Sequence, residues 1–239
     1  MIKIENTDVM GWEAAIRGMR NPMNSWYRSD SKFDCDHHCG ICSACSSFEL
    51  CGNIGKNDHD LMMRLASGGP VHAKYRRMIT VYCDITAPLY WWSEYDTYKV
   101  GTVANSCSKM HKIEAKEFTL SDFSCEHLMA WSDYEDEVKQ LELDRLCNFK
   151  FYMLDTISAL NNARDLYLET KDKRYWWQMI QLLPSSYNQR RTVMLNYEVL
   201  AGIYPMRKDH KLDEWHTFCD WIKTLPYSEI ITGEQDESK

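Results

Sequence analysis

A dense group of cysteines is the feature of this sequence best suited to chemistry. Five of the ten cysteines fall within residues 35–51, namely Cys35, Cys39, Cys42, Cys45 and Cys51. Thiolates two or three residues apart can turn inward around one ion, at about 2.3 Å from zinc. Short gaps of this kind also occur in iron–sulfur ligand runs. The spacing predicts a zinc ion or an iron–sulfur cluster, with a reduced, metal-free loop as the alternative.

We expect such a metal to be structural rather than catalytic. The segment around these cysteines is long and polar, so few apolar contacts are available to offset the entropy lost when it becomes ordered. A bound ion supplies that free energy in many small metal-binding loops. The other five cysteines, by contrast, are spread along the chain, and reduced cysteine is among the most buried residue types. Four of them are expected in the core, and Cys107 could line a pocket.

The charge balance restricts the classes of partner. The chain has 28 basic and 35 acidic residues, a formal net charge of -7. A broad nucleic-acid surface needs a clustered excess of Lys and Arg, so the composition argues against one. It leaves room for a small basic pocket. No signal peptide and no apolar run of about 18 residues is visible, so we expect a cytoplasmic protein without a membrane span.

Two stretches of the chain resemble the flavin-dependent thymidylate synthases, the ThyX family, in the order of their motifs. That family has a Glu-His before a strand, an Ala-Pro that opens a helix, and then Arg-His-Arg-x-x-Ser-x-Asn-x-x-Ser-x-Arg. Here His72 precedes a predicted strand, and Ala87-Pro88 follows that strand. The matching motifs of the C-terminal third are Leu183-Pro184, Asn196 and Arg207. The resemblance covers residues from about 9 to 225, apart from the cysteine-rich segment.

The central motif can be aligned in two registers. Without a gap, the Arg-His-Arg of the family falls on Thr97-Tyr98-Lys99, and its later positions fall on Thr102, Cys107 and Lys109. With one residue added, Asn105 and Ser108 match the Asn and the later Ser, and Met110 replaces the last Arg. Glu198 stands where the family has an Arg after the helix Asn. Both registers remain open.

The resemblance implies an α+β fold in which long helices pack on a small, mostly antiparallel sheet, assembled as a homotetramer. The implied function is flavin-dependent transfer of a one-carbon unit (methyl or hydroxymethyl) to C5 of a pyrimidine deoxynucleotide such as dUMP. FAD would be the cofactor, with methylene-tetrahydrofolate and NADPH as possible co-substrates. The alternative is a ThyX-derived module without activity that binds a nucleotide or another protein.

The resemblance also assigns site residues. The cofactor contacts would be His72, Lys99, Thr102 and Asn105, and the substrate contacts would be Ser106, Cys107, Ser108, Lys109 and Arg207. These residue types suit a nucleotide, because an arginine can hold a phosphate bidentately and lysines can neutralise it. Amide and hydroxyl groups can donate to and accept from a pyrimidine edge. No enzyme nucleophile is required, because the cofactor carries the difficult chemistry.

Hydrophobic periodicity predicts the elements that must position these residues. We expect a strand over residues 79–85 and loops over 20–57 and 97–112. The expected helices cover residues 9–19, 58–67, 138–160, 192–203 and 212–222. The aromatic runs Tyr90-Trp91-Trp92 and Tyr175-Trp176-Trp177 are more often packing than a cofactor platform. The chain is expected to form one domain over residues 1–232, with a cysteine-rich insert at about 33–56 and an acidic tail over 233–239.

Overall fold

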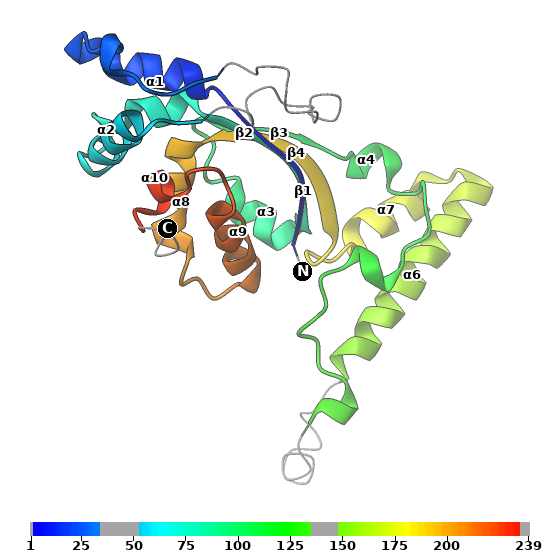
Figure 1. Ribbon diagram of the computed structural model, residues 1–239. Helices are drawn as coiled ribbons and strands as arrows, with labels where there is room; N and C mark the ends of the chain where they lie inside the picture. Colours follow the sequence, from blue (N-terminus) through cyan, green and yellow to red (C-terminus); the bar gives the residue numbers. More distant parts are fainter. Residues whose placement is uncertain (1, 34–52, 135–147, 235–239) are drawn as a thin grey trace, which may run out of the picture. The chain divides into compact units, whose positions relative to one another are not determined.

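The computed structural model describes residues 2–33, 53–134 and 148–234 (Figure 1). The cysteines Cys35 to Cys51 therefore lie outside the described residues, as do Cys147 and the end of the acidic tail. The strands are β1 (Lys3–Met10), β2 (Thr80–Pro88), β3 (Val103–Ser106) and β4 (Asn188–Asn196). The helices are α1 (Trp12–Arg20), α2 (Lys56–Ser67), α3 (Leu89–Tyr95), α4 (Lys109–Lys112), α6 (Phe149–Thr170), α7 (Lys173–Leu182), α8 (Tyr197–Arg207), α9 (Asp213–Lys223) and α10 (Glu229–Thr232).

The described chain divides into two compact units. Unit 1 comprises residues 86–94 and the described part of 106–190, and unit 2 comprises residues 2–85, 95–105 and the described part from 191 onward. The fold is α+β, with helices packed on a small antiparallel sheet, as the sequence predicted. A single domain over residues 1–232 stays a prediction.

The sheet has four strands in the order β1-β2-β4-β3. In β2, Val81, Cys83 and Ile85 are buried and alternate with more exposed residues, which is the period-two pattern of a strand with one covered face. In Figure 1 the C-terminal helices α8, α9 and α10 of unit 2 lie on one side of the sheet. Their buried residues include Leu200 and Trp215, so the apolar face of the sheet and these helices form the core of unit 2.

Unit 1 is organised around α6 and α7, which pack against each other. Its core consists of Ile113, Phe118, Phe123, Ile157, Leu160, Ala163 and Met179. Asn161, on α6, ties the preceding segment to the helix, since its side chain accepts from the Phe118 backbone N–H and donates to the Phe118 carbonyl. The periodic positions Ile157 and Leu160 predicted from the sequence are therefore core residues. The part of the predicted helix before residue 148 lies outside the described residues, and α6 continues ten residues beyond the predicted end.

Asp58 connects α1, α2 and the segment between them in unit 2. Its side chain is completely buried, and its Oδ1 accepts from Arg20 Nε at 2.5 Å. Its Oδ2 accepts from the Ser29 and Ser31 hydroxyls, both at 2.7 Å, and from the backbone N–H groups of Asp30 and Ser31. Burial alone would raise the pKa of Asp58, but the hydrogen bonds from Ser31, Ser29 and Arg20 outweigh burial and hold it below its usual value.

The start of α2 is capped from a distant segment. Asn57 and Asp58 are residue types that commonly cap helices, but the N-cap residue is Gly55. Instead, the Asp30 carboxylate accepts from the backbone N–H groups of Asn57 and Asp58. A Cβ at Gly55 would lie 2.2 Å from Asp30 Cγ, so the close approach that allows this cap requires glycine.

Two predicted helices begin as strands. Val9 was assigned to a helix but lies in β1, which precedes α1, and the break is at Gly11. Gly11 has a φ of 97°, and a Cβ there would lie 2.0 Å from the Met78 carbonyl oxygen, so only glycine fits. Residues 192–196 were likewise assigned to a helix but belong to β4, where Val193 and Leu195 are buried alternately. Leu195 fits both periods, and only the tertiary structure selects the strand.

The remaining expectations are mostly confirmed. The helices over 58–67 and 212–222 and the strand over 79–85 are present, and α1 ends before Asn21-Pro22. The loop predicted over 97–112 is wrong in part, because it contains β3 and α4. Trp91 and Trp92 are buried core residues, whereas Trp177 is 43% exposed. Among the described residues, no helix is both long enough and apolar enough to cross a membrane.

Two of the scattered cysteines are core residues, as expected. Cys83 and Cys219 are buried, and burial raises the pKa of the Cys83 thiol to about 12 and that of Cys219 to about 11. Both thiols are therefore protonated and inert at neutral pH. Cys125 is half-buried and Cys107 is exposed. The expectation of a buried side chain thus holds for two of the three described cysteines to which it applied.

Replacing Asp58 with alanine should destabilise the protein by about 3–5 kcal/mol, because the buried guanidinium of Arg20 loses its counter-charge. The free energy of unfolding, measured by urea denaturation, tests this. Asp60→Ala is the matched control, since Asp60 lies on the same helix and is exposed, and it should change stability by less than about 0.5 kcal/mol. Equal effects of the two substitutions would contradict the role of Asp58.

The same carboxylate makes stability depend on pH. The pKa of Asp58 is lower in the folded protein than the ordinary value of 3.8. Its contribution is therefore fully present above pH 3.8 and is lost as the pH falls through the lower folded pKa. In Asp58→Asn this acid-dependent loss should be smaller than in the natural protein, which urea denaturation between pH 5 and pH 2.5 would show.

Candidate functional site

Unit 2 contains a cavity of about 490 Å³ at the point where β4 passes into α8. It is lined by Arg77, Thr97, Tyr98, Val100, Gly101, Asn196, Glu198, Val199 and Gly202. Three of these come from the first turns of α8, and four come from the loop over residues 97–101. Small-molecule sites in proteins commonly measure about 300–1,000 Å³. The volume suits a mononucleotide or the ring system of a larger cofactor.

The wall of the cavity is shaped by the junction between β4 and α8. Asn196 is the N-cap of α8, and its Oδ1 accepts from the Val199 backbone N–H at 3.0 Å. Gly101 faces this cap with a φ of 81°, and a Cβ there would lie 3.1 Å from both Asn196 Nδ2 and Val199 Cγ2. The Thr102 hydroxyl donates to the Tyr98 carbonyl, which closes the turn on the other side of Gly101. Loop and helix are therefore fitted closely together.

Arg207 braces the aromatic part of this wall. Its Nε donates to the Tyr98 hydroxyl at 2.8 Å, and its Cζ lies 4.5 Å from the ring centroid of Trp215, which is fully buried. A guanidinium held over an aromatic face contributes about 0.5–2 kcal/mol. Tyr98 lines the cavity and Arg207 does not. Arg207, at the end of α8, thus fixes the position of the Tyr98 ring.

The charges at the cavity come mainly from two adjacent arginines that precede β2. Arg76 Nε donates to Glu198 Oε2 at 2.7 Å, in a pair whose side chains are 11% and 18% exposed. Arg76 also donates to the Ile230 carbonyl. The carboxylate of Glu198 is therefore neutralised, and Arg77 is the cation that lines the cavity. Sequence reasoning gave these arginines no role, although two adjacent cations before a predicted strand were a visible signal.

The predicted cofactor residues all lie in unit 2. Lys99 is exposed and Thr102 is half-buried, in the loop that borders the cavity, and Asn105 is exposed on β3. His72 is exposed and precedes a short 3-10 helix, Ala73–Met78, which carries Arg76 and Arg77. The structure brings the loop of Lys99 and Thr102 together with Asn196 at one cavity. It does not place His72 or Asn105 in the lining of that cavity.

The predicted substrate residues are divided between the units. Arg207 belongs to unit 2, whereas Ser106, Cys107, Ser108 and Lys109 belong to unit 1. Ser106, Cys107 and Ser108 are exposed. The backbone of Cys107 is fixed to β4, because its N–H donates to the Arg190 carbonyl at 3.0 Å and its carbonyl accepts from Gln189 Nε2 at 2.8 Å. The assignment of these residues to a substrate stays a prediction.

No protein-family model matches this chain, and no curated protein is similar to it in sequence. Known structures do match. A Helicobacter pylori thymidylate synthase X (ThyX) with FAD and dUMP has a TM-score of 0.62 at 14% identity, covering 98% of both chains. The chain has the fold of ThyX. A second structure of Helicobacter pylori ThyX complexed with FAD and dUMP has a TM-score of 0.59 at 13% identity, covering 97% of this chain and 98% of that one.

The UMP/dUMP methylase PolB from Streptomyces cacaoi, bound with 5-Br UMP, also shares the ThyX-like fold. Its TM-score is 0.59 at 12% identity, and the match covers 98% of this chain and 95% of the other. The likeness extends over the full length of the matched proteins. At this identity it establishes the fold alone. The cavity where β4 passes into α8 is called the ThyX-like cavity below, only after the fold that contains it.

The lining of the ThyX-like cavity fits one phosphate-bearing aromatic ligand. Tyr98, Val100 and Val199 offer a ring face and two apolar side chains, against which a base or a flavin ring could stack. Asn196 and Thr97 offer polar edges, and Arg77 offers a cation for phosphate. Within the described residues, no three His, Cys, Asp or Glu side chains are grouped so that they could hold a metal ion.

Two glycines of the ThyX-like cavity should respond oppositely to alanine. Gly101→Ala should destabilise the protein by about 1–2 kcal/mol, because a side chain at positive φ is strained and the new Cβ meets Asn196 and Val199. Gly202→Ala should stabilise it by about 0.5–1 kcal/mol, since Gly202 is helical and a Cβ there meets nothing within 4 Å. Thermal or urea unfolding of both variants measures these changes in stability. A Gly202→Ala variant less stable than the natural protein would contradict the open space around residue 202.

Proposed function

We propose that this protein binds a pyrimidine nucleotide at the ThyX-like cavity, uses a flavin as cofactor, and transfers a one-carbon unit to C5 of a pyrimidine deoxynucleotide. The observation that carries the proposal is the convergence at one cavity of the Tyr98–Lys99 loop, the Asn196 cap and the Arg207 brace. The resemblance in sequence singled out these same segments, and the overall fold is that of ThyX.

The protein's own side chains would bind and orient the ligands. Arg77 would hold a phosphate, and Tyr98, kept in place by Arg207, would present a ring face for stacking. The Asn196 side-chain amide is fixed through its carbonyl, so its NH₂ group is oriented toward Gly101. Preorganised contacts of this kind lower the entropy that a ligand must lose on binding.

The cofactor set follows from the proposed reaction. Methylene-tetrahydrofolate would donate the methylene group, the C5 proton would leave, and the hydride that completes the methyl group would come from FAD reduced by NADPH. Lys99, Thr102, Asn105 and His72 remain the proposed cofactor contacts. Ser106, Cys107, Ser108, Lys109 and Arg207 remain the proposed substrate contacts. Assembly as a homotetramer and a cytoplasmic location belong to the same proposal.

One observation favours the second candidate, an inactive nucleotide-binding module. Glu198 occupies a position where the family has an arginine, and the charge of Glu198 is neutralised by Arg76. Arg77 alone supplies positive charge among the described lining residues. A cavity with one cation suits a mononucleotide better than a dinucleotide, whose pyrophosphate carries more charge. A ThyX-derived protein that no longer binds a flavin but still binds a nucleotide would need only such a cavity with one cation.

Analysis of co-purifying small molecules and metals separates the two candidates. If the enzyme proposal is correct, denaturation of the yellow protein releases FAD, which absorbance and mass spectrometry detect. A colourless protein that takes up no FAD on incubation but binds dUMP contradicts the flavin proposal and supports the binding module.

The same samples test the metal proposed at Cys35, Cys39, Cys42, Cys45 and Cys51. Elemental analysis should give zinc or iron, and labile sulfide would accompany an iron–sulfur cluster. Replacing Cys39 and Cys42 together with serine should remove the metal. Metal-free natural protein, purified under reducing conditions, would contradict the site.

Arg77→Ala should weaken binding of dUMP at least about tenfold, the effect of a lost hydrogen bond to a charged group. Isothermal titration calorimetry with dUMP measures it. Lys74→Ala is the matched control, because Lys74 is an exposed cation on the same 3-10 helix and does not line the cavity.

Arg207→Ala should also weaken dUMP binding, through loss of the support for Tyr98. Tyr98→Phe, which keeps the ring and removes the hydroxyl that Arg207 holds, should have a smaller effect. Unchanged affinity in both Arg77→Ala and Arg207→Ala would remove this cavity from the proposal.

A further inference from the structure

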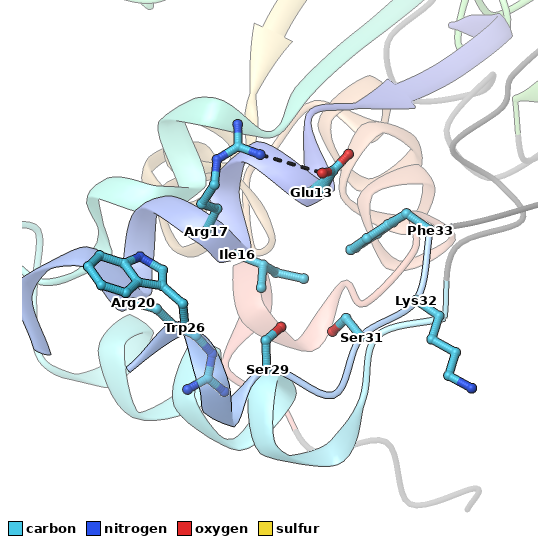
Figure 2. Close-up of a pocket in the computed structure, with 9 residues that line it drawn as sticks. All are labelled: Glu13, Ile16, Arg17, Arg20, Trp26, Ser29, Ser31, Lys32 and Phe33. Carbon is cyan, nitrogen blue, oxygen red and sulfur yellow. Dashed lines mark hydrogen bonds and ion pairs between the residues drawn. The ribbon is translucent and has the colours of Figure 1, made fainter. Parts of the chain in front are cut away.

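A second cavity in unit 2, of about 480 Å³, lies between α1 and the segment over residues 26–33 (Figure 2). It shares no lining residue with the ThyX-like cavity. The proposed function therefore leaves it unused. Its lining combines apolar, hydroxyl and cationic side chains, and this combination indicates the kind of molecule that it can hold.

One part of the lining is apolar and aromatic. Figure 2 shows the side chains of Ile16 and Phe33 directed toward each other across the cavity, with Trp26 at another side. Trp26 is 50% exposed, and its Nε1 donates to Asn21 Oδ1 at 2.7 Å, which fixes the ring. A half-exposed tryptophan held in one orientation offers a ready face for stacking.

The charged side chains among the described residues of the lining are predominantly positive. They are Arg17, Arg20 and Lys32, against one carboxylate, Glu13. Arg17 contacts Glu13 at 3.4 Å in a pair whose side chains are about two-thirds exposed. Exposed pairs of this kind contribute only about 0–1 kcal/mol, so Arg17 can exchange Glu13 for a stronger anion at little cost.

Arg20 adds one unused hydrogen-bond donor to the lining. Its side chain is 3% exposed, and its Nη2 has no hydrogen-bond partner among the described residues. Arg20 is paired with Asp58, which lies outside the lining of the cavity. An incompletely satisfied buried guanidinium gains from a nearby anion, because fields are weakly screened where water is excluded.

The two serine hydroxyl groups of the lining cannot donate hydrogen bonds to a ligand. Ser29 and Ser31 both donate their protons to Asp58 Oδ2, and the Ser31 oxygen also accepts from the Gly55 N–H. Neither hydroxyl has a second proton to give to a ligand, so the donors for an anion must be the cations. The two serines are held rigidly, and the segment that carries them is therefore preorganised.

We propose that this cavity is a separate binding site for a phosphate monoester with an aromatic body, of the size of a nucleoside monophosphate. The dianionic phosphate would be bound by Arg17 and by the unused Nη2 donor of Arg20, one turn further along α1, with Lys32 adding positive charge from the opposite side of the cavity. The aromatic body would lie against Trp26, Ile16 and Phe33. Nothing in this proposal requires the ThyX-like cavity to be occupied or active.

Phenyl phosphate is the probe, with inorganic phosphate and phenol as its two halves. Ligand-observed NMR titration of the full chain gives the three dissociation constants. Phenyl phosphate should bind at least about tenfold more tightly than either half, since each half loses one of the two recognised groups. Equal affinities for phenyl phosphate and phenol, or for phenyl phosphate and inorganic phosphate, overturn the proposal.

Substitutions locate the probe. Arg17→Glu and Lys32→Glu should each weaken phenyl phosphate at least about fivefold, and Trp26→Ala should abolish its advantage over inorganic phosphate. Arg64→Glu is the matched control, because Arg64 is an exposed cation that lines only the neighbouring cavity next to Arg28. Arg64→Glu should leave the affinity for phenyl phosphate unchanged.

Two results would place the probe elsewhere. If Arg64→Glu weakens phenyl phosphate and Arg17→Glu does not, the neighbouring cavity binds it and the proposal fails. If only Arg77→Ala weakens it, the ThyX-like cavity binds it, which again overturns this proposal but leaves the proposed function standing. Thermal melting of each variant confirms that the substitutions, all of them at the surface, leave the fold intact.

Discussion

The Asp58 carboxylate is completely buried and accepts hydrogen bonds from Arg20 on α1 and from the Ser29–Ser31 segment. Asp30, in that segment, in turn accepts from the backbone N–H of Asp58 at the start of α2. Burying a charge is costly unless every lone pair is used, and here five donors meet two oxygens. The network joins α1, α2 and the segment between them at one buried side chain. Both the second cavity and the cap of α2 exist because the intervening segment is drawn onto Asp58.

The shape of the ThyX-like cavity likewise depends on a few specific contacts between the elements that line it. The loop with Gly101 at positive φ packs against the N-cap of α8. Arg207 lies over the rings of Tyr98 and Trp215 and holds the aromatic part of the cavity wall in place. Backbone constraints and polar hydrogen bonds thus hold the walls of both cavities in place. The neutralisation of Glu198 by Arg76 shows how the charge of such a site can be altered without disturbing its walls.

The sequence was sufficient for the fold class and for elements whose periodicity has one interpretation, such as α2, α9 and β2. It failed where two periods coincide, as at Leu195, and where a glycine separates a strand from a helix, as at Gly11. The segments of the candidate site were identified through the order of motifs around Lys99, Asn196 and Arg207. The different roles of Arg76 and Arg77 could not be identified in this way. They depend on the pairing of Arg76 with Glu198, which joins positions 122 residues apart.

The antiparallel bridge between Lys32 and Asn53 has a consequence for the segment that it encloses. The two backbone hydrogen bonds of this bridge, at 2.9 and 2.8 Å, join the residues on either side of 34–52. The folded unit itself therefore holds the two ends of this segment together, so the entropy of joining them does not depend on the composition of the segment. Insertions or deletions within residues 34–52 should therefore leave the pairing of Lys32 with Asn53 intact.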